Sequence, residues 1–347
     1  MCIRDRVNVY EALKKYKRIS IIGMEKNVGK TTVLNFLIDK VGTKNILGIT
    51  SIGRDGEDTD VVTSTSKPRI YIYPNTIIAT ARDCLRNCDI TGEILYTTDF
   101  STPMGNIVIV RAISAGYVDI AGPSYNSQIK DILSIMENFG VEISIVDGAL
   151  SRKGSAVSDV TNATILSTGA ALSLDMGHVI DETKTTVFLL NLPGLENDLL
   201  RERIEECFKT SRFAILYENG DIKRLENTTS LEATDEIKSC LGQDLKAIAI
   251  RGAVTQKFLE TLVKNRQNFD KLELIIKDGT RVFADFITLK KIEACKIKIK
   301  VLYPINLLFI TCNPRSPLGY EFPKQKFKQL LEENIKVDVI DVLGEEE

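Results

Sequence analysis

A short strand, a glycine-bearing loop and a helix follow one another near the start of the chain, and this order limits the folds open to it. Arg18–Gly23 is a β-branched apolar run that ends in glycine, and Lys30–Lys40 carries apolar residues at helical spacing. Between them lies GMEKNVGKTT, which has most of a phosphate-binding loop. The usual pattern, G-x-x-x-x-G-K-S/T, would place its first glycine at Met24, whereas this chain has Gly23, one residue earlier. The sequence therefore predicts a strand–loop–helix unit with a displaced entry glycine.

The residues of this loop are those that a bound phosphate needs. A helix N-terminus carries roughly half a positive charge, and its backbone N–H groups point at the anion. Gly29 permits a turn with positive φ, Lys30 reaches the β and γ oxygens, and Thr31 offers its hydroxyl to Mg²⁺. The alternative is that G-K-T-T merely begins a helix after a tight turn. No N-K-x-D run is present to read guanine, so we expect Mg²⁺ and ATP, with contacts to Gly23, Lys26, Asn27, Val28, Gly29, Lys30, Thr31 and Thr32.

A second strand end supplies a carboxylate for the metal. Val141–Val146 is an apolar strand, and Asp147 and Gly148 follow it directly. Hydrated Mg²⁺ beside nucleotide phosphates is held or oriented by such a carboxylate. We therefore predict Asp147 as a metal ligand; the alternative is that it caps the next helix.

An acidic segment after another strand is the third candidate. SIGRDGEDTD, residues 51–60, follows the predicted strand Ile46–Thr50 and so lies at the same sheet edge as the loop. We predict Asp55 in two roles, as a Mg²⁺ ligand and as a catalytic group that contacts the attacking water. Lys30 is the other predicted catalytic residue. The alternative for this segment is a solvated acidic turn.

Strands and helical patterns alternate along most of the chain, which predicts an α/β fold of the P-loop NTPase type, with a mostly parallel sheet flanked by helices. We expect a nucleotide-binding domain at residues 7–205 and a second, smaller α/β domain at residues 206–347. The predicted strands Leu307–Thr311 and Val337–Val342 fall in the second domain, and Thr186–Leu190 is a predicted strand of the first. We attribute residues 1–6, MCIRDR, to a sequencing adapter rather than to the gene.

Composition argues against several classes of function. The 45 Lys+Arg and 47 Asp+Glu residues give a formal net charge of −2, with neither sign massed in a block, so nucleic acid is not the expected partner. The apolar runs are far shorter than the roughly 20 residues of a membrane span, and no secretory signal is evident. Seven cysteines without a C-x-x-C pair are typical of reduced thiols. We expect a cytoplasmic protein without a membrane partner.

Two of these segments are similar to the dethiobiotin synthetase and cobyrinic-acid amidotransferase group. That group carries G-x-x-x-x-x-G-K-T, usually with valine before the second glycine, as at Gly23 and residues 28–31 here. VDGA, residues 146–149, resembles its E-G-A-G-G segment, with Asp147 in the place of the metal-binding glutamate, but the glycines after Ala149 are missing. The resemblance implies a working loop. It also keeps open a small-molecule ligase or kinase in which ATP is activated for attack by a carboxylate or carbamate.

A longer set of segments resembles the reactivating-factor subunit of lysine 5,6-aminomutase, a protein of amino-acid-fermenting bacteria. The resemblance implies ATP-dependent rescue of a coenzyme B12 enzyme whose damaged cobalamin must be exchanged. The implied partners are the B12-dependent aminomutase and a second reactivase ATPase subunit, and the implied device is a switch in which Mg²⁺ and the γ-phosphate order the Asp55 loop. A non-hydrolysing nucleotide-binding module is a third reading. The segments are GMEKNVGKTT, TSIGRDGE, KPRIYIY, NTIIATA, TPMGNIVIVRAIS, AGPSYNSQ and VDGALSRK.

Overall fold

The structure is a computed structural model that describes residues 8–53, 69–149, 160–225, 230–242, 244–269 and 271–344. The chain divides into two compact units. Unit 1 comprises Met1–Ile180 together with Asn306–Glu347, and unit 2 comprises Asp181–Ile305. This division corrects the predicted one, which placed a single boundary after residue 205. The second unit interrupts the first, and the chain returns to unit 1 for its last segment.

Unit 1 is built on one large sheet. Its strands in chain order are β1 (Arg18–Gly23), β2 (Leu47–Ser51), β4 (Ile77–Ala81), β5 (Gly92–Thr102), β6 (Gly105–Ala112), β8 (Ile143–Ala149), β9 (Ala163–Gly169), β17 (Leu307–Asn313) and β18 (Val339–Ile340). Within the described residues the sheet is nine-stranded, in the order β18-β17-β9-β1-β8-β2-β4-β6-β5. Every neighbouring pair from β18 to β4 is parallel, and β6 is antiparallel to β4 and β5. The predicted α/β architecture with a mostly parallel sheet is confirmed.

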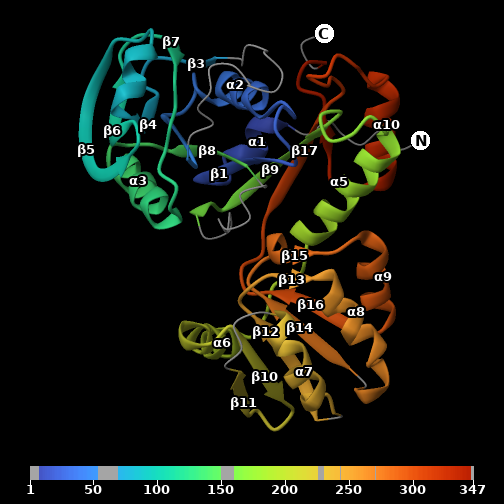
Figure 1. Ribbon diagram of the computed structural model, residues 1–347. Coiled ribbons are helices and arrows are strands. Elements are labelled where there is room, and N and C mark those ends of the chain that lie inside the picture. The colour runs from blue at the N-terminus through green and yellow to red at the C-terminus, as the bar shows by residue number, and fades with distance from the viewer. Residues whose placement is uncertain are drawn as a thin grey trace. The chain divides into compact units, whose positions relative to one another are not determined.

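Helices cover both faces of this sheet (Figure 1). Helices α1 (Val9–Leu13) and α2 (Lys30–Val41) pack on one face, and α3 (Asn126–Asn138) packs on the other. Strand β8 shows the division, because Ile145 lies in the core with α2 whereas Val146 lies in the core with α3. Side chains two positions apart on a strand share a face. A side chain two residues after Ile145 is therefore on the α2 side.

The two last strands, β17 and β18, belong to this sheet and not to a second domain, which corrects the prediction made from their position late in the chain. Strand β17 lies between β9 and β18, with Ile310 opposite both Leu166 and Val339. The physical reason is burial: Phe309 is fully buried and joins the core formed with α1 and α2. The remaining elements of unit 1 are β3 (Ile70–Ile72), η1 (Arg82–Asn87), β7 (Gly116–Val118) and α10 (Lys324–Asn334).

Unit 2 has a smaller sheet of its own. Within the described residues it is five-stranded, in the order β11-β10-β12-β14-β16. Strands β12, β14 and β16 are parallel to one another, and β10 is antiparallel to its two neighbours. Its elements are α6 (Asp198–Thr210), β10 (Phe213–Tyr217), β11 (Ile222–Leu225), α7 (Ser230–Cys240), β12 (Leu245–Ile250), β13 (Val254–Thr255), α8 (Gln256–Lys264), η2 (Arg266–Asn268), β14 (Leu272–Ile276), η3 (Gly279–Arg281), β15 (Val282–Phe283), α9 (Phe286–Ala294) and β16 (Ile297–Val301).

Helix α5 (Met176–Leu190) replaces the strand predicted at Thr186–Leu190. The β-branched and aromatic residues of that run favour a strand when they are considered alone. The run is instead the last part of a 15-residue helix, whose buried residues lie on more than one spacing. Tertiary packing therefore overrides the local preference. The buried residues are Val179, Ile180, Thr183, Thr185, Val187, Leu189 and Leu190.

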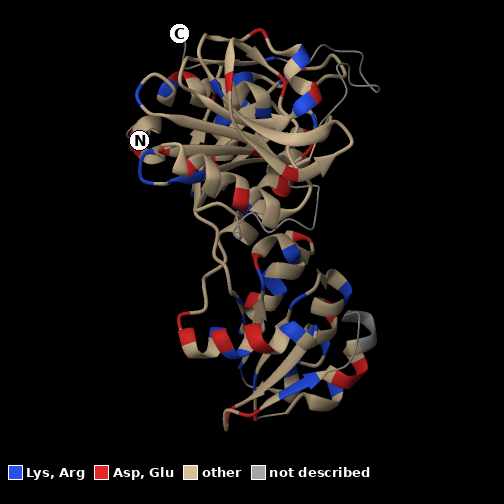
Figure 2. Ribbon diagram, turned by 90° about the vertical axis from the view of Figure 1, so that its left-hand side faces the viewer, with Lys and Arg blue, Asp and Glu red and all other residues tan. Residues whose placement is uncertain are grey.

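Charged side chains are interspersed in both units. Figure 2 shows Lys and Arg beside Asp and Glu along the ribbons of each unit, in keeping with the nearly equal numbers of the two signs in the sequence. In the described part of the chain, no helix has the length and apolar character that crossing a bilayer requires. The cysteines of the same part of the chain are free thiols.

Candidate functional site

The loop between β1 and α2 explains why its entry glycine stands one position early. A Cβ atom on Gly23 would lie 2.8 Å from Lys30 Cδ, 2.9 Å from Lys30 Nζ and 2.8 Å from Val28 Cγ2. Real Cβ atoms do not approach other heavy atoms this closely, so a side chain at position 23 would have to displace Lys30 or Val28 from the places that they occupy. The lysine side chain thus passes back over the end of β1. Gly23 is the residue that this path requires, although the usual pattern places glycine at Met24.

Two left-handed residues turn the chain from the loop into the helix. Asn27 has φ of 61°, and Gly29, the N-cap of α2, has φ of 90°. Glycine adopts such a conformation without steric cost, and asparagine tolerates it better than most residues. The two residues therefore re-aim the backbone immediately before Lys30. The predicted turn at Gly29 is present.

The N-terminus of α2 has backbone donors without partners in the described part of the chain. No side chain described in the structure caps the helix at Gly29. Among the described residues, the backbone N–H groups of Lys30, Thr31 and Thr32 have no backbone acceptor. Such N–H groups, together with the helix dipole, favour a bound anion. An anion could take the place of the missing cap.

Lys30 carries a positive charge in the loop itself. The residue is buried, with 9% of its surface exposed, and its Nζ donates a hydrogen bond of 3.3 Å to the backbone carbonyl of Glu25. No carboxylate forms a salt bridge with Lys30 in the part of the chain that the structure describes. A buried ammonium group is costly unless an opposite charge or strong acceptors surround it. A phosphate group has the charge and the acceptor oxygens that would satisfy it.

Asp147 lies on the strand next to β1. Strand β8 pairs with β1 in parallel, with Asp147 opposite Ile21 on one side and opposite Ser51 of β2 on the other. Asp147 follows Ile145 by two positions, so its side chain is on the α2 face of the sheet, and it is partly exposed. The carboxyl ends of parallel strands share one edge, so the carboxylate belongs to the same edge as the loop. The prediction of Asp147 as a metal ligand requires a position at this edge.

The other predicted residues have varied outcomes. Asp55 lies outside the described residues. Lys26 is exposed, and its backbone N–H donates to Glu25 Oε1 over 2.9 Å. Val28 lies in the loop and is buried. Thr32 lies in the first turn of α2 and is partly exposed. No group of three or more His, Cys, Asp or Glu side chains suited to a metal occurs among the described residues. Any Mg²⁺ here would therefore need phosphate oxygens or water among its ligands.

Asn313 is a residue of this site that sequence reasoning missed. It ends β17, two strands away from β1, and its Nδ2 donates a hydrogen bond of 3.4 Å to the backbone carbonyl of Asn27. The intervening strand also holds the loop, because the N–H of Met24 donates to the carbonyl of Ser167 over 3.0 Å. The candidate site thus draws on β1, β8, β9 and β17. No protein-family model, curated protein or solved structure matches this chain.

Proposed function

We propose that this protein binds Mg-ATP at the β1–α2 loop and is a subunit of an ATP-dependent reactivase for the B12-dependent lysine 5,6-aminomutase. On this proposal unit 1 is a P-loop NTPase-like domain and the protein works in the cytoplasm. Nucleotide binding is supported by the loop geometry. The reactivase role is supported by the resemblance of seven sequence segments to the reactivating-factor subunit.

One observation carries the nucleotide-binding proposal: the side chain of the buried Lys30 lies over Gly23, beside a helix N-terminus that no described side chain caps. Lys30 and the backbone N–H groups at the start of α2 fit a polyphosphate. Among the described residues, no carboxylate forms a salt bridge with Lys30, and no side chain caps the helix. A simple helix start does not need either feature.

The roles of the individual residues follow from their chemistry. Lys30 and the N–H groups of the first turn of α2 would hold the β- and γ-phosphates. The Thr31 hydroxyl and the Asp147 carboxylate would hold or orient Mg²⁺ through oxygen, the ligand type that this ion prefers. When bound, Mg²⁺ neutralises charge on the phosphate oxygens. Asp55 keeps its proposed role as metal and water contact.

A partner-binding role is favoured over a small-molecule ligase by two features. The glycines that follow the E-G-A segment in the ligases are replaced after Ala149. The chain also has a second compact unit, which supplies surface that a ligase of this type does not need. We propose that the aminomutase and the second ATPase subunit bind there.

The test is ATP turnover measured with and without the proposed partners. The protein would be assayed alone, and then with a cobalamin-inactivated aminomutase, the second ATPase subunit and fresh coenzyme. We expect turnover that recovers mutase activity and is lost in Lys30→Ala. Steady turnover without partners would indicate a small-molecule enzyme, and nucleotide binding without turnover in any mixture would indicate a binding module.

A further inference from the structure

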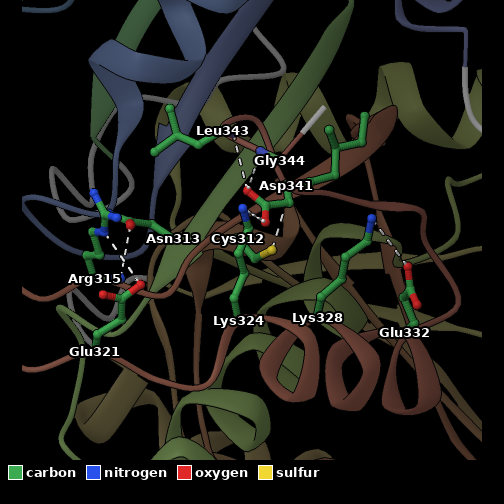
Figure 3. A network of polar contacts seen from close by, with 11 residues as sticks. Cys312, Asn313, Arg315, Glu321, Lys324, Lys328, Glu332, Asp341, Leu343 and Gly344 are labelled. Carbon is green, nitrogen blue, oxygen red and sulfur yellow. Dashed lines mark hydrogen bonds and ion pairs between the residues drawn. The ribbon is translucent and has the colours of Figure 1, made fainter. Parts of the chain in front are cut away.

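Asn313 is held rigidly at the end of β17. Its backbone carbonyl accepts the N–H of Ala170 over 2.9 Å, and a Cβ atom on Gly169 would lie 2.4 Å from that carbonyl oxygen. Its side-chain Oδ1 accepts the backbone N–H of Arg315 over 3.1 Å, a bond drawn in Figure 3. The residue after β9 therefore holds the backbone of Asn313, and the residue two positions after β17 holds its side chain.

The bond to Arg315 also sets which way the Asn313 amide faces. A backbone N–H can only donate, so the atom that meets it must be the amide oxygen. The amide nitrogen is then left for the loop. It lies 3.4 Å from the carbonyl oxygen of Asn27 and would be 3.5 Å from a Cβ atom on Gly29.

The contact acts on the peptide group that joins Asn27 to Val28. In a trans peptide the C=O and N–H bonds point in opposite directions. Because the Asn27 carbonyl points toward Asn313, the N–H of Val28 points away from Asn313. A phosphate-binding loop needs its N–H groups toward the anion and its carbonyl groups turned away. Asn313 thus fixes the orientation of one peptide group of the loop, close to Asn27 and Gly29, the two residues in the left-handed conformation.

We infer that Asn313 is a positioning residue, which orders the phosphate-binding loop from the strand that follows unit 2 in the chain. The inference rests on the proposed nucleotide site but adds a distinct claim about the free protein. The donor that orders the loop at Gly23–Gly29 comes from a distant part of the chain, since Asn27 and Asn313 are 286 residues apart.

The chain offers a matched control at the other end of the same strand segment. Asn306 Nδ2 donates to the backbone carbonyl of Asn162 over 2.7 Å. Asn306 directly precedes β17, whereas Asn313 is its last residue, so the two lie at opposite ends of the strand. We would compare Asn313→Asp with Asn306→Asp. Each change replaces an amide donor by a carboxylate of the same shape, and the carboxylate introduced by Asn313→Asp would keep an acceptor for the Arg315 N–H.

Two readouts separate this inference from the proposed function. Tryptic cleavage after the exposed Lys26 in nucleotide-free protein reports on loop order without any ligand, and ATP affinity reports on the site. We expect Asn313→Asp to speed cleavage and weaken ATP binding about fivefold or more, the loss expected for one hydrogen bond, while Asn306→Asp changes neither. Unchanged cleavage after Lys26 in Asn313→Asp would overturn the inference. Absence of ATP binding in the wild type would instead refute the proposed function, and the cleavage comparison would still decide the role of Asn313.

Discussion

The side chain of Lys30 passes so close to the backbone of Gly23 that a β-carbon there would lie 2.8 Å from Lys30 Cδ. This relationship joins the two ends of the loop, one at the end of β1 and the other at the start of α2. The close approach explains on steric grounds why glycine stands at position 23, whatever the usual spacing of phosphate-binding loops. It also places the ammonium group over the loop instead of in solvent.

Gly23→Ala tests this relationship. The added methyl group must displace Lys30 or Val28, so we expect ATP affinity to fall about tenfold or more, equivalent to about 1.4 kcal/mol. Gly252→Ala is the control, because nothing lies within 4 Å of a Cβ atom at Gly252. Isothermal titration calorimetry would measure both. Equal affinities for Gly23→Ala and the wild type would show that the path of Lys30 does not matter for binding.

The loop could be predicted from the sequence because its parts are local. An apolar β-branched run, a glycine, and an amphipathic helix after G-K-T are neighbours in the chain, and β1 and α2 form where their patterns place them. Asp147 is predictable in the same way, as a polar residue after an apolar run, although β8 continues past it to Ala149.

Asn313 has the same local signal as Asp147 and was still missed. It follows the apolar run Leu307–Cys312, but its role depends on the pairing of β17 with β9 across the whole of unit 2. No local pattern specifies that pairing, because it is set by burial of residues such as Phe309 in the core of unit 1. The strand predicted at Thr186–Leu190 is wrong for a similar reason, since the residues that make it helical precede it.

Asp147→Asn tests the metal assignment. The amide keeps the size of the carboxylate but lacks its charge, so we expect the Mg²⁺ requirement for tight ATP binding to weaken, with the affinity for metal-free ATP retained. Asp39→Asn is the control, since Asp39 lies near the far end of α2 and accepts a hydrogen bond from the Tyr73 hydroxyl. Titration of ATP at a series of Mg²⁺ concentrations would measure the effect. The same Mg²⁺ dependence in Asp147→Asn and the wild type would exclude Asp147 as a ligand.

Cys312 gives a prediction for the pH dependence of stability. Burial, followed by the nearby Asp341 carboxylate, raises the pKa of the Cys312 thiol to about 12. An unfolded cysteine has a pKa of about 8.5. Folding thus favours the protonated thiol, and its contribution is complete below about pH 8.5 and is lost as the pH rises toward 12.

The difference in free energy of unfolding between the wild type and Cys312→Ala isolates this group from other titrations. We expect this difference to shrink as the pH is raised from about 8 toward about 10.5, as measured by urea denaturation. Alkylation of Cys312 by iodoacetamide at about pH 8 should also be slower than that of the partly exposed Cys295. A difference that stays constant with pH would mean that Cys312 ionises as readily in the folded protein as in the unfolded chain.

The most direct test of the account is the affinity for Mg-ATP of the wild type and Lys30→Ala, measured by calorimetry with thermal unfolding as the check on the fold. A charge-assisted hydrogen bond contributes about 1.5–3 kcal/mol, so we predict a loss of roughly 10- to 100-fold or more with an unchanged or slightly raised unfolding temperature, because a buried charge is removed. Lys26→Ala, at an exposed position of the same loop, should lose much less. Equal ATP affinity in Lys30→Ala and the wild type, or no binding to the wild type, would contradict the assignment of this loop as the nucleotide site.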